Sequence, residues 1–517
     1  MNNRLRALAC FLLIGLIFSG CASIPFDRPK EYSRAFTDTA DTELGKVAAR
    51  WAKDHGNLSA FYPLEGGMDA LGVRLKLADL AERSIDLQYF LMKDDTAGGV
   101  MTEALLRAAD RGVRVRFLLD DIFTTVKDSS LLLMNRHPNV EVRLFNPISR
   151  RGWSFLNFVG QFEQANRRMH NKSFTVDNQA SVVGGRNIAD EYYQLDESCL
   201  FSDFDVFAIG PIARQVSDSF DLYWNHSRAV PMEYVARNQG GGDARAAREE
   251  AQRRLEKVYS SVYEKAVESR LLQDLFDERR PLFPATARVF ADNPDKVIDH
   301  LDESTDSASR EESWIVAELR QILLEAEKEA IFLSPYFVPG ENGVEFIRAL
   351  EEKGVRVVVV TNSLASTNHI PVHSAYAGYR EEVIKAGAEL YEVRADAAAE
   401  VIESDDGPDT MTLHTKALVI DKRLLIIGSL NFDPRSIEIN AEMVMMIDSN
   451  KMIESLTADM DERLANRTYR VVLDEDEDLC WHGRVEGKQV IETSEPLSGL
   501  WRRFKAWFMK IVPESQL

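Results

Sequence analysis

The chain reads His170-Asn-Lys-Ser-Phe-Thr-Val-Asp177 in its first half and His414-Thr-Lys-Ala-Leu-Val-Ile-Asp421 in its second. Six residues further on, each stretch is followed by small residues and an asparagine: Gly184-Gly-Arg-Asn187 and Gly428-Ser-Leu-Asn431. One His-x-Lys tripeptide would arise by chance. The same groups at the same spacing in two places indicate a functional site rather than two coincidental strand-turn elements.

The sequence around these stretches repeats as well. Arg111-Gly-Val-Arg-Val-Arg-Phe-Leu-Leu-Asp120 corresponds to Lys353-Gly-Val-Arg-Val-Val-Val-Val-Thr-Asn362. Hydrophobic periodicity predicts helices over 68–81, 98–111 and 343–352, and strands over 84–91, 113–119, 140–145, 330–336 and 354–361. Strands that alternate with helices are typical of an α/β layered fold, here expected in two copies.

The repeat and the changes in composition divide the chain into six predicted segments. They are a leader (1–20), a polar linker (21–60), a first α/β domain (61–237), a helical connector rich in Ala, Arg and Glu (238–290), a second α/β domain (291–470) and a C-terminal tail (471–517).

The residue types in the repeated stretch suit phosphodiester chemistry. Residues two apart on a strand share a face, so symmetry would bring together the side chains of His170, Lys172, His414 and Lys416. One neutral imidazole attacks phosphorus to form a phosphohistidine, and the other, protonated, donates to the leaving alkoxide. The lysines hold the non-bridging oxygens, so we expect no metal and no other cofactor. Which histidine is the nucleophile stays open.

The rest of each motif is predicted to support this centre. Asn187 and Asn431 donate further hydrogen bonds to the phosphate. The small residues Gly184, Gly428 and Ser429 allow the backbone to approach closely.

Each histidine needs a carboxylate to fix its tautomer. Asp177 and Asp421 lie at strand ends and are expected to be structural, anchoring the turn that follows. Glu442 is a better candidate for one histidine. Asp203 is the candidate for the other, and Asp205 competes with it because spacing alone does not separate the two.

Composition excludes some classes of function. Apolar residues make up 45% of the chain, which is typical of a folded body, and acidic residues outnumber basic ones 83 to 62, giving a net charge of -21. This balance argues against nucleic acid as a partner. No metal-ligand spacing or disulfide framework is formed by the four cysteines, Cys10, Cys21, Cys199 and Cys480.

Several segments of the chain resemble a known protein family. The segments that carry the resemblance are Asn166-Arg-Arg-Met-His170 with its following motif, Val183-Gly-Gly-Arg-Asn-Ile-Ala-Asp190, Thr361-Asn-Ser-Leu-Ala365, residues 373–379 and Gly428-Ser-Leu-Asn-Phe-Asp-Pro-Arg-Ser436. They resemble the phospholipase D superfamily and, within it, the bacterial cardiolipin synthases, the C type most closely. The resemblance runs from about Phe61 to the C-terminus.

The resemblance implies two pseudo-symmetric phospholipase D-type α/β/α sandwich domains with one active site shared at their interface. It implies a metal-independent phosphatidyltransferase that acts on phospholipids and passes a phosphatidyl group to phosphatidylglycerol. The donor would be phosphatidylethanolamine, associated with the C type, or phosphatidylglycerol. Catalytic and supporting roles are implied for His170, Lys172, His414, Lys416, Asn187, Asn431, Glu442 and Asp203.

The N-terminus resembles a bacterial lipoprotein signal. Arg4 and Arg6 precede a short apolar run, Leu8 to Phe18, which ends at Ser-Gly-Cys21. Cys21 would be the lipidated residue, and Ala22 after it resembles an outer-membrane address. We therefore expect a lipoprotein of the cell envelope, on the periplasmic face of the outer membrane. An ordinary secretory signal or an uncleaved anchor is the alternative, and a lipoprotein signal departs from the usual C-type enzyme.

Two further segments suggest contact with a membrane surface. The stretch Leu500-Trp-Arg-Arg-Phe-Lys-Ala-Trp-Phe-Met-Lys-Ile511 places apolar residues at helical spacing among cations, as an interfacial helix does. A terminal helix docked on the body is the alternative. The aromatic residues Trp153, Phe155, Phe158 and Phe162 line an acyl-chain entrance or belong to the core.

Three other functions are alternatives to phosphatidyl transfer. A hydrolytic phospholipase D shares the first half-reaction, so the motifs do not separate it from a transferase. A nuclease is disfavoured by the acidic composition. An inactive scaffold would show decay in one motif, and both are complete.

Overall fold

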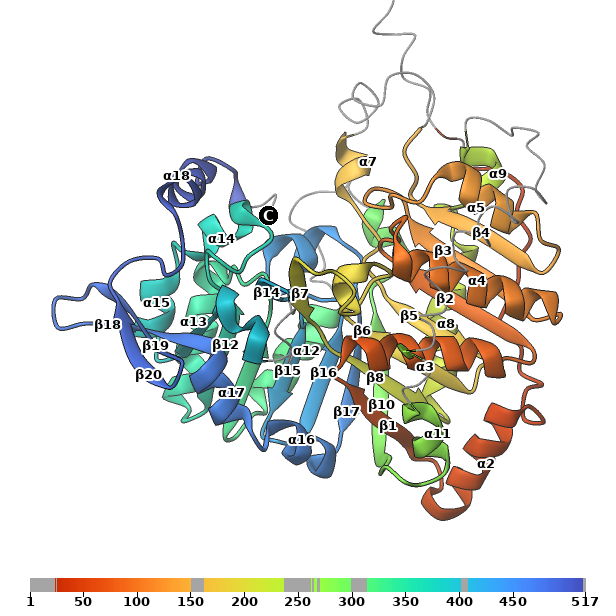
Figure 1. Cartoon of the computed structure of the whole chain (residues 1–517), viewed down its shortest axis with the longest axis horizontal. Coiled ribbons are helices and arrows are strands. Elements are labelled where there is room, and N and C mark those ends of the chain that lie inside the picture. Colours follow the sequence, from red (N-terminus) through yellow and green to blue (C-terminus); the bar gives the residue numbers. More distant parts are fainter. Residues whose placement is uncertain are drawn as a thin grey trace, which may run out of the picture.

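The computed structural model describes residues 24, 26–149, 162–236, 262, 265–266, 270–298, 314–400 and 408–514. It confirms the α/β class and shows two similar units side by side (Figure 1). Sequence colours from red through yellow to the first greens of α9 and α11 mark one unit, and colours from the green of β10 to blue mark the other.

The first half begins with helix α2 and ends with helix α11. Its helices are α2 (Glu43–His55), α3 (Gly67–Leu80), α4 (Thr96–Asp110), α5 (Asp128–Asn135), α7 (Phe162–Asn166), η1 (Asp190–Tyr192), α8 (Ile212–Asn225), α9 (Met232–Val235) and α11 (Leu271–Phe276). Its strands are β1 (Ser59–Leu64), β2 (Ser84–Tyr89), β3 (Arg114–Asp120), β4 (Val140–Phe145), β5 (Ser173–Val176), β6 (Ala180–Gly184), β7 (Cys199–Ser202), β8 (Asp205–Ile209) and β9 (Ala229–Pro231).

The second half begins with strand β10. Its strands are β10 (Phe283–Ala291), β11 (Glu329–Leu333), β12 (Arg356–Asn362), β13 (Glu389–Val393), β14 (Thr410–Leu413), β15 (Ala417–Ile420), β16 (Leu424–Gly428), β17 (Met443–Asp448), β18 (Thr468–Leu473), β19 (Leu479–Val485) and β20 (Lys488–Glu492). Its helices are η2 (Pro294–Val297), α12 (Trp314–Leu324), α13 (Gly340–Glu352), α14 (Ile370–Tyr376), α15 (Arg380–Lys385), η4 (Ala395–Glu400), η5 (Arg435–Ile439), α16 (Asn450–Thr457), α17 (Met460–Arg467) and α18 (Leu500–Met509).

The two halves share one continuous 18-stranded sheet. Pairing runs β9-β4-β3-β2-β5-β6-β8-β1 through the first half and β10-β17-β16-β15-β11-β12-β13-β18-β19-β20 through the second. The antiparallel pair β1–β10 joins them, with Ala60 opposite Pro284. Read outward from this pair, the first seven strands on either side follow the same order, which is the pseudo-two-fold symmetry expected from the repeat.

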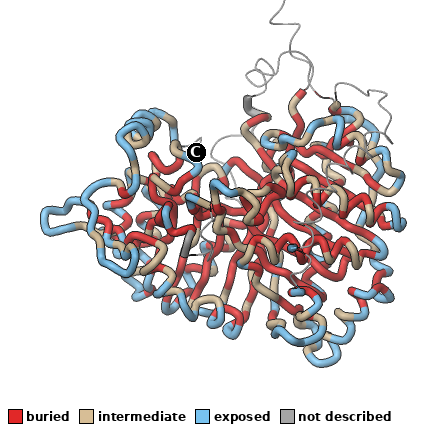
Figure 2. Tube along the Cα trace, viewed as in Figure 1, coloured by how far each residue is buried: buried red, intermediate tan, exposed pale blue. Residues whose placement is uncertain are grey.

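Helices cover both faces of the sheet, because alternate residues of a strand face opposite ways. In β2, Ile85, Leu87 and Tyr89 lie in one apolar core with residues of α3 and α4. Asp86 faces the other way, where Arg116 binds it at 2.6 Å and binds Asp221 of α8 at 2.8 Å. The strands of both halves form the buried interior in Figure 2.

The predicted helices and strands are present, with ends that shift by a few residues. The strand predicted over 84–91 ends at Tyr89, since its ladder with β5 stops at Gln88 opposite Ser173. The strand predicted over 330–336 ends at Leu333 for the same reason, opposite Ala417 of β15.

The fold extends beyond the predicted domain boundaries. Within the predicted linker (21–60), α2 forms, and the Ser33 backbone exchanges two hydrogen bonds with the side-chain amide of Asn225 in α8, so this polar stretch packs on the first domain. Within the predicted tail (471–517), β18 to β20 continue the sheet. Within the predicted connector (238–290), α11 packs its leucines into the first core and β10 begins at Phe283.

Helix α18 lies at the surface against α14 (Figure 1). None of its residues is buried, and its apolar side chains are exposed. Among the described residues, no helix combines the length and the hydrophobicity that crossing a bilayer requires.

Candidate active site

Each repeated motif opens a β-hairpin. His170 and Lys172 lead into the β5–β6 hairpin, and His414 and Lys416 lead into the β15–β16 hairpin. Asp177 and Asp421 begin the tight turns, with φ of 51° and 53°, in the left-handed region that aspartate tolerates.

The motif aspartates hold the backbone of a neighbouring segment. Asp177 accepts hydrogen bonds from the amides of Glu82, Arg83 and Ser84 at 2.8 to 3.1 Å, and Asp421 accepts three from residues 327–329 at 2.7 to 3.0 Å. These amides precede β2 and β11. The aspartates therefore anchor the start of the neighbouring strand. We had expected each aspartate to anchor the turn that follows its own strand.

The two halves exchange carboxylates across the site. His170 Nδ1, from the first half, lies 2.9 Å from Glu442 Oε2 of the second half. His414 Nδ1, from the second half, lies 2.6 Å from Asp203 Oδ2 of the first half. Each histidine is thus oriented by the other half, and neither half holds a complete site.

Short strand pairings across the interface bring these residues together. β7, which leads to Asp203, pairs in parallel with β14, which leads to His414. On the symmetric side, Met169 bridges Ala441, and the His170 amide donates to the Ala441 carbonyl at 2.8 Å. The backbone therefore fixes both histidine–carboxylate pairs.

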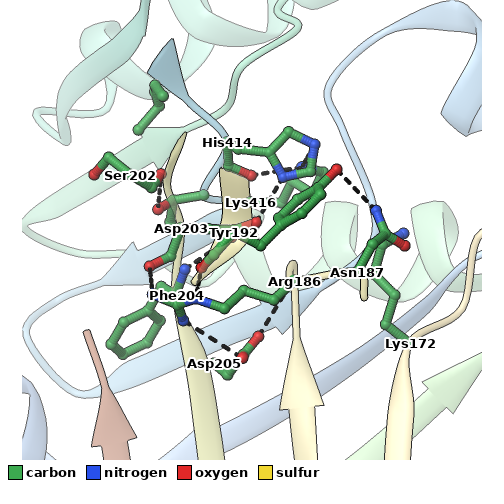
Figure 3. A network of polar contacts seen from close by, with 12 residues as sticks. Lys172, Arg186, Asn187, Tyr192, Ser202, Asp203, Phe204, Asp205, His414 and Lys416 are labelled. Atoms are coloured by element: carbon green, nitrogen blue, oxygen red, sulfur yellow. Dashed lines mark hydrogen bonds and ion pairs between the residues drawn. The ribbon is translucent and has the colours of Figure 1, made fainter. Parts of the chain in front are cut away.

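Asp203 rather than Asp205 is the partner of His414. Asp205 lies within β8 and binds the guanidinium of Arg74 at 2.8 Å and that of Arg186 at 3.4 Å. Arg186 also donates to the main-chain carbonyl of Asp203 at 2.6 Å. Figure 3 shows Asp203 directed at His414, with Arg186 and Asp205 behind it.

Both lysines lie beside the histidines in an almost closed centre. Lys172 Nζ donates to the His170 carbonyl, and Lys416 Nζ donates to the His414 carbonyl, each at 2.5 Å. Burial lowers the pKa of Lys172 to about 7 and that of Lys416 to about 8. A bound anion would offset this burial, so the empty centre is built to receive negative charge.

The surroundings of both histidines favour the neutral imidazole. Burial, followed by the charge of the adjacent lysine, lowers the pKa of His414 to about 3 and that of His170 well below its usual range. Their side chains retain 7% and 10% of their exposure, so a substrate can reach them. A phosphodiester anion would balance the lysine charge and allow one imidazole to carry a proton.

The carboxylates differ in their protonation. Burial raises the pKa of Glu442 to about 7. Burial would also raise the pKa of Asp203, but electrostatic attraction to the His414 ring, the hydrogen bond from that ring and the charge of Lys416 outweigh it and lower the pKa.

The small residues are required where two backbones meet. A Cβ on Gly184 would lie 2.2 Å from Asp205 Oδ1, and one on Gly428 would lie 2.1 Å from the Met443 carbonyl. Ser429 occupies the equivalent of Gly185, and its hydroxyl donates to Glu442 Oε2.

The motif asparagines have protein partners while no substrate is bound. Asn187 Nδ2 donates to the Tyr192 hydroxyl at 2.9 Å, and Asn431 Nδ2 donates to Ser436 Oγ at 3.3 Å. Asn431 Oδ1 is buried and has no hydrogen-bond partner within the described residues.

Comparison with known proteins decides the family. A family model described as "Cardiolipin synthase, PLD-like domain" matches residues 75–224 and 319–464. The chain belongs to this cardiolipin synthase family. Each matched segment contains one histidine-lysine motif, and the two segments lie within the predicted domains 61–237 and 291–470.

Relatives within the cardiolipin synthase family cover most of the chain. The chain is 35% identical to "Cardiolipin synthase C" of Escherichia coli (strain K12) over 473 residues, which span 91% of this chain and 98% of that protein. It is 25% identical to "Cardiolipin synthase A" of Pseudomonas entomophila (strain L48), over 74% of this chain and 65% of that protein. A crystal structure of phosphatidylserine synthase from Haemophilus influenzae Rd KW20 has the same fold, with a TM-score of 0.50, 13% identity, and coverage of 81% of this chain and 91% of that one.

The aromatic residues that contact the two histidines were not predicted from the sequence. The Phe90 ring meets His170 edge-on at 4.8 Å between centroids, and Tyr192 meets His414 in the same way at 5.0 Å. Phe201 stacks on His414 at 5.2 Å. Tyr192 and Phe201 flank motif residues, and Phe90 follows a central strand, but no spacing rule marks them.

Other predictions concern residues that the structure does not describe, or a metal site. Cys21, Trp153, Phe155 and Phe158 lie outside the described residues, as does the side chain of Phe162. Within the described part of the chain, no three His, Cys, Asp or Glu side chains are grouped so that they could hold a metal ion.

Proposed function

We propose that this protein synthesises cardiolipin by transferring a phosphatidyl group to phosphatidylglycerol through a phosphohistidine intermediate. The donor is phosphatidylethanolamine or phosphatidylglycerol. The observation that carries the proposal is the crossed pair of histidine–carboxylate contacts, at 2.9 and 2.6 Å, around two buried lysines. Membership of the cardiolipin synthase family, and the relative named cardiolipin synthase C, support the substrate class.

The first half-reaction forms the covalent intermediate. Nε2 of one neutral histidine attacks phosphorus, and the bond from phosphorus to the headgroup oxygen breaks. The other histidine, protonated once substrate balances the lysine charge, gives its proton to that oxygen, and ethanolamine or glycerol leaves. Glu442 and Asp203 orient the rings through Nδ1, so that Nε2 is the nitrogen that reacts. Lys416 Nζ lies 3.2 Å from Nε2 of His414.

The second half-reaction reverses the roles. The deprotonated histidine takes a proton from a hydroxyl of phosphatidylglycerol, whose oxygen attacks phosphorus while the phosphorus–nitrogen bond breaks. Lys172 and Lys416 hold the non-bridging oxygens, where negative charge builds in both transition states. The amides of Asn187 and Asn431 turn from Tyr192 and Ser436 toward the same oxygens.

The enzyme works at a lipid surface. Along α18, apolar side chains project outward: Trp501 is 65% exposed, Trp507 66% and Leu500 85%. Lys505, also exposed, adds positive charge for anionic headgroups. We further propose that Cys21 carries a lipid anchor and that the enzyme faces the periplasm on the outer membrane, which the signal-like N-terminus supports.

A lipid-product assay tests the proposal. Purified enzyme receives labelled phosphatidylethanolamine in vesicles, with and without phosphatidylglycerol. Labelled cardiolipin that appears only when both lipids are present is the expected result. Phosphatidic acid in both mixtures would indicate hydrolysis by water instead, and no turnover of either lipid would overturn the proposed substrate class.

A further inference from the structure

The two copies of the motif differ in charge at one position close to the reacting groups. Four residues after the motif asparagine, the first copy has Glu191 and the second has Arg435. Glu191 is neutralised locally, because Lys93 Nζ binds its Oε1 at 2.5 Å. The centre is therefore symmetric in its histidines, lysines and asparagines, but it gains a positive charge on one side only.

Arg435 is a mostly buried cation that forms no ion pair with the described residues. Burial lowers its pKa, and the charge of Asp433, which acts at longer range, raises it. Its Nη1 donates to Asn166 Oδ1 at 2.5 Å, and its Nη2 donates to the Asn166 carbonyl at 2.6 Å. Both partners are neutral, and no carboxylate of the described residues lies within ion-pair distance of the guanidinium. Its Nε donates no hydrogen bond to these residues and is not among their buried, unsatisfied atoms.

The guanidinium lies near the reaction centre, because it binds Asn166, four residues before His170, and the neighbouring Ser436 accepts a hydrogen bond from the motif residue Asn431. Its charge contributes to the lowered pKa of His170 and to that of His369, after burial in each case. His369 contacts the ring of Tyr336, and the Tyr336 hydroxyl donates to Asn368 at 3.0 Å. The charge of Arg435 therefore acts on both His170 and His369.

The proposed reaction requires one more cation than the motifs supply. The two lysines hold the phosphate that is transferred, but phosphatidylglycerol brings a second phosphate, one glycerol away from the hydroxyl that attacks. A guanidinium whose Nε donates no hydrogen bond to the described residues is suited to donate one to a phosphate. We propose that Arg435 binds the phosphate of the acceptor lipid and so selects phosphatidylglycerol over neutral alcohols; this inference rests on the proposed function.

A purely structural role for Arg435 predicts a different outcome. Asn166 lies four residues before His170, so the contact with Arg435 also helps to hold the histidine strand. Asn166→Ala removes the side-chain half of that contact and keeps the arginine. The two variants therefore separate binding of the acceptor phosphate from positioning of His170.

The test compares an anionic and a neutral acceptor. With labelled phosphatidylethanolamine as donor, initial rates are measured in separate assays with phosphatidylglycerol or with glycerol, which yields phosphatidylglycerol. For Arg435→Gln, we expect the ratio of the first rate to the second to fall about 10- to 100-fold, with a raised KM for phosphatidylglycerol, because a charge-assisted hydrogen bond is lost. Arg435→Lys keeps the positive charge but not the planar set of N–H donors, so it should recover part of the ratio. Asn166→Ala should keep the wild-type ratio.

The experiment distinguishes failure of the acceptor site from failure of the proposed function. Equal losses with both acceptors in Arg435→Gln, or the same change of ratio in Asn166→Ala, would overturn the acceptor site and leave the proposed function standing. A wild-type enzyme that forms no cardiolipin would overturn both.

Discussion

The two carboxylates behind the histidines occupy unlike environments. Asp203 is held ionised by the charges around His414, whereas burial raises the pKa of Glu442 to about 7. Both side chains are fully buried, so each must be stabilised by the few groups it touches. Glu442, which the proposed function requires, therefore lowers the stability of the fold.

We predict that Glu442→Gln stabilises the empty protein more at pH 8 than at pH 5, while it lowers turnover. The folded pKa of about 7 exceeds the ordinary value of 4.5, so the unfolded chain releases this proton first and stability falls as the pH rises from 4.5 to 7. Glutamine has no such proton. Thermal unfolding of both proteins at the two pH values measures the effect, with the exposed Glu454→Gln as the matched control.

That prediction would be contradicted if the difference between Glu442→Gln and wild type were the same at pH 5 and pH 8. The cardiolipin assay run in parallel separates stability from catalysis, since a variant that is more stable and less active has lost an orienting group rather than its fold.

Sequence reasoning identified most polar residues of the site but not how they pair. The duplicated spacing marked His170 and His414, and Glu442 and Asp203 were expected to orient them. The crossed pairing depends on how two halves dock, which no local pattern contains. The aromatic contacts of Phe90 and Phe201 follow from the same docking and carry no sequence signature.

At the scale of single elements, helix α18 reverses the usual arrangement of a surface helix. Its arginines face the protein: Arg502 Nε donates to the Leu364 carbonyl and Arg503 donates to the Glu495 carbonyl, each at 2.6 Å. Its large apolar side chains are exposed, and the trace of this segment has the colours of exposed and intermediate residues in Figure 2. A helix held by polar contacts with an apolar outer face is suited to a lipid interface.

We predict that Trp501→Ser combined with Trp507→Ser weakens binding to vesicles rich in anionic lipid by at least about tenfold, because burying an aromatic side chain contributes a few kcal/mol. The thermal unfolding temperature should not change, since both rings are exposed. Cosedimentation with vesicles measures the binding. Ile491→Ser, at a 64% exposed position on β20, is the matched control.

An unfolding temperature that falls in the double tryptophan variant, with unchanged vesicle binding, would instead support a helix that only packs on the body. The sequence predicted this helix from its periodicity but left both roles open, because periodicity identifies an apolar face without saying what covers it.

At the scale of the whole molecule, the shared sheet makes the two halves one unit. The sheet is continuous through β1 and β10, and β10 also pairs with β17 of its own half. The fold class and the repeat were predictable from the alternation of strands and helices. The continuous sheet was not, because β1 crosses the predicted boundary between the linker and the first domain, and β10 lies almost entirely in the predicted connector.

This architecture predicts how two inactive chains behave together. His170→Ala and His414→Ala should each lower turnover at least about a thousandfold, because each removes either the nucleophile or the acid-base group. Both should fold, since circular dichroism and unfolding temperature report a sheet that neither substitution breaks. Mixed in equal amounts, they should stay inactive, because the pairings of β1 with β10 and of β7 with β14 connect the two histidines of the same chain. Activity that returns on mixing would mean that halves exchange between chains, and full activity of either single variant would remove the two-histidine mechanism itself.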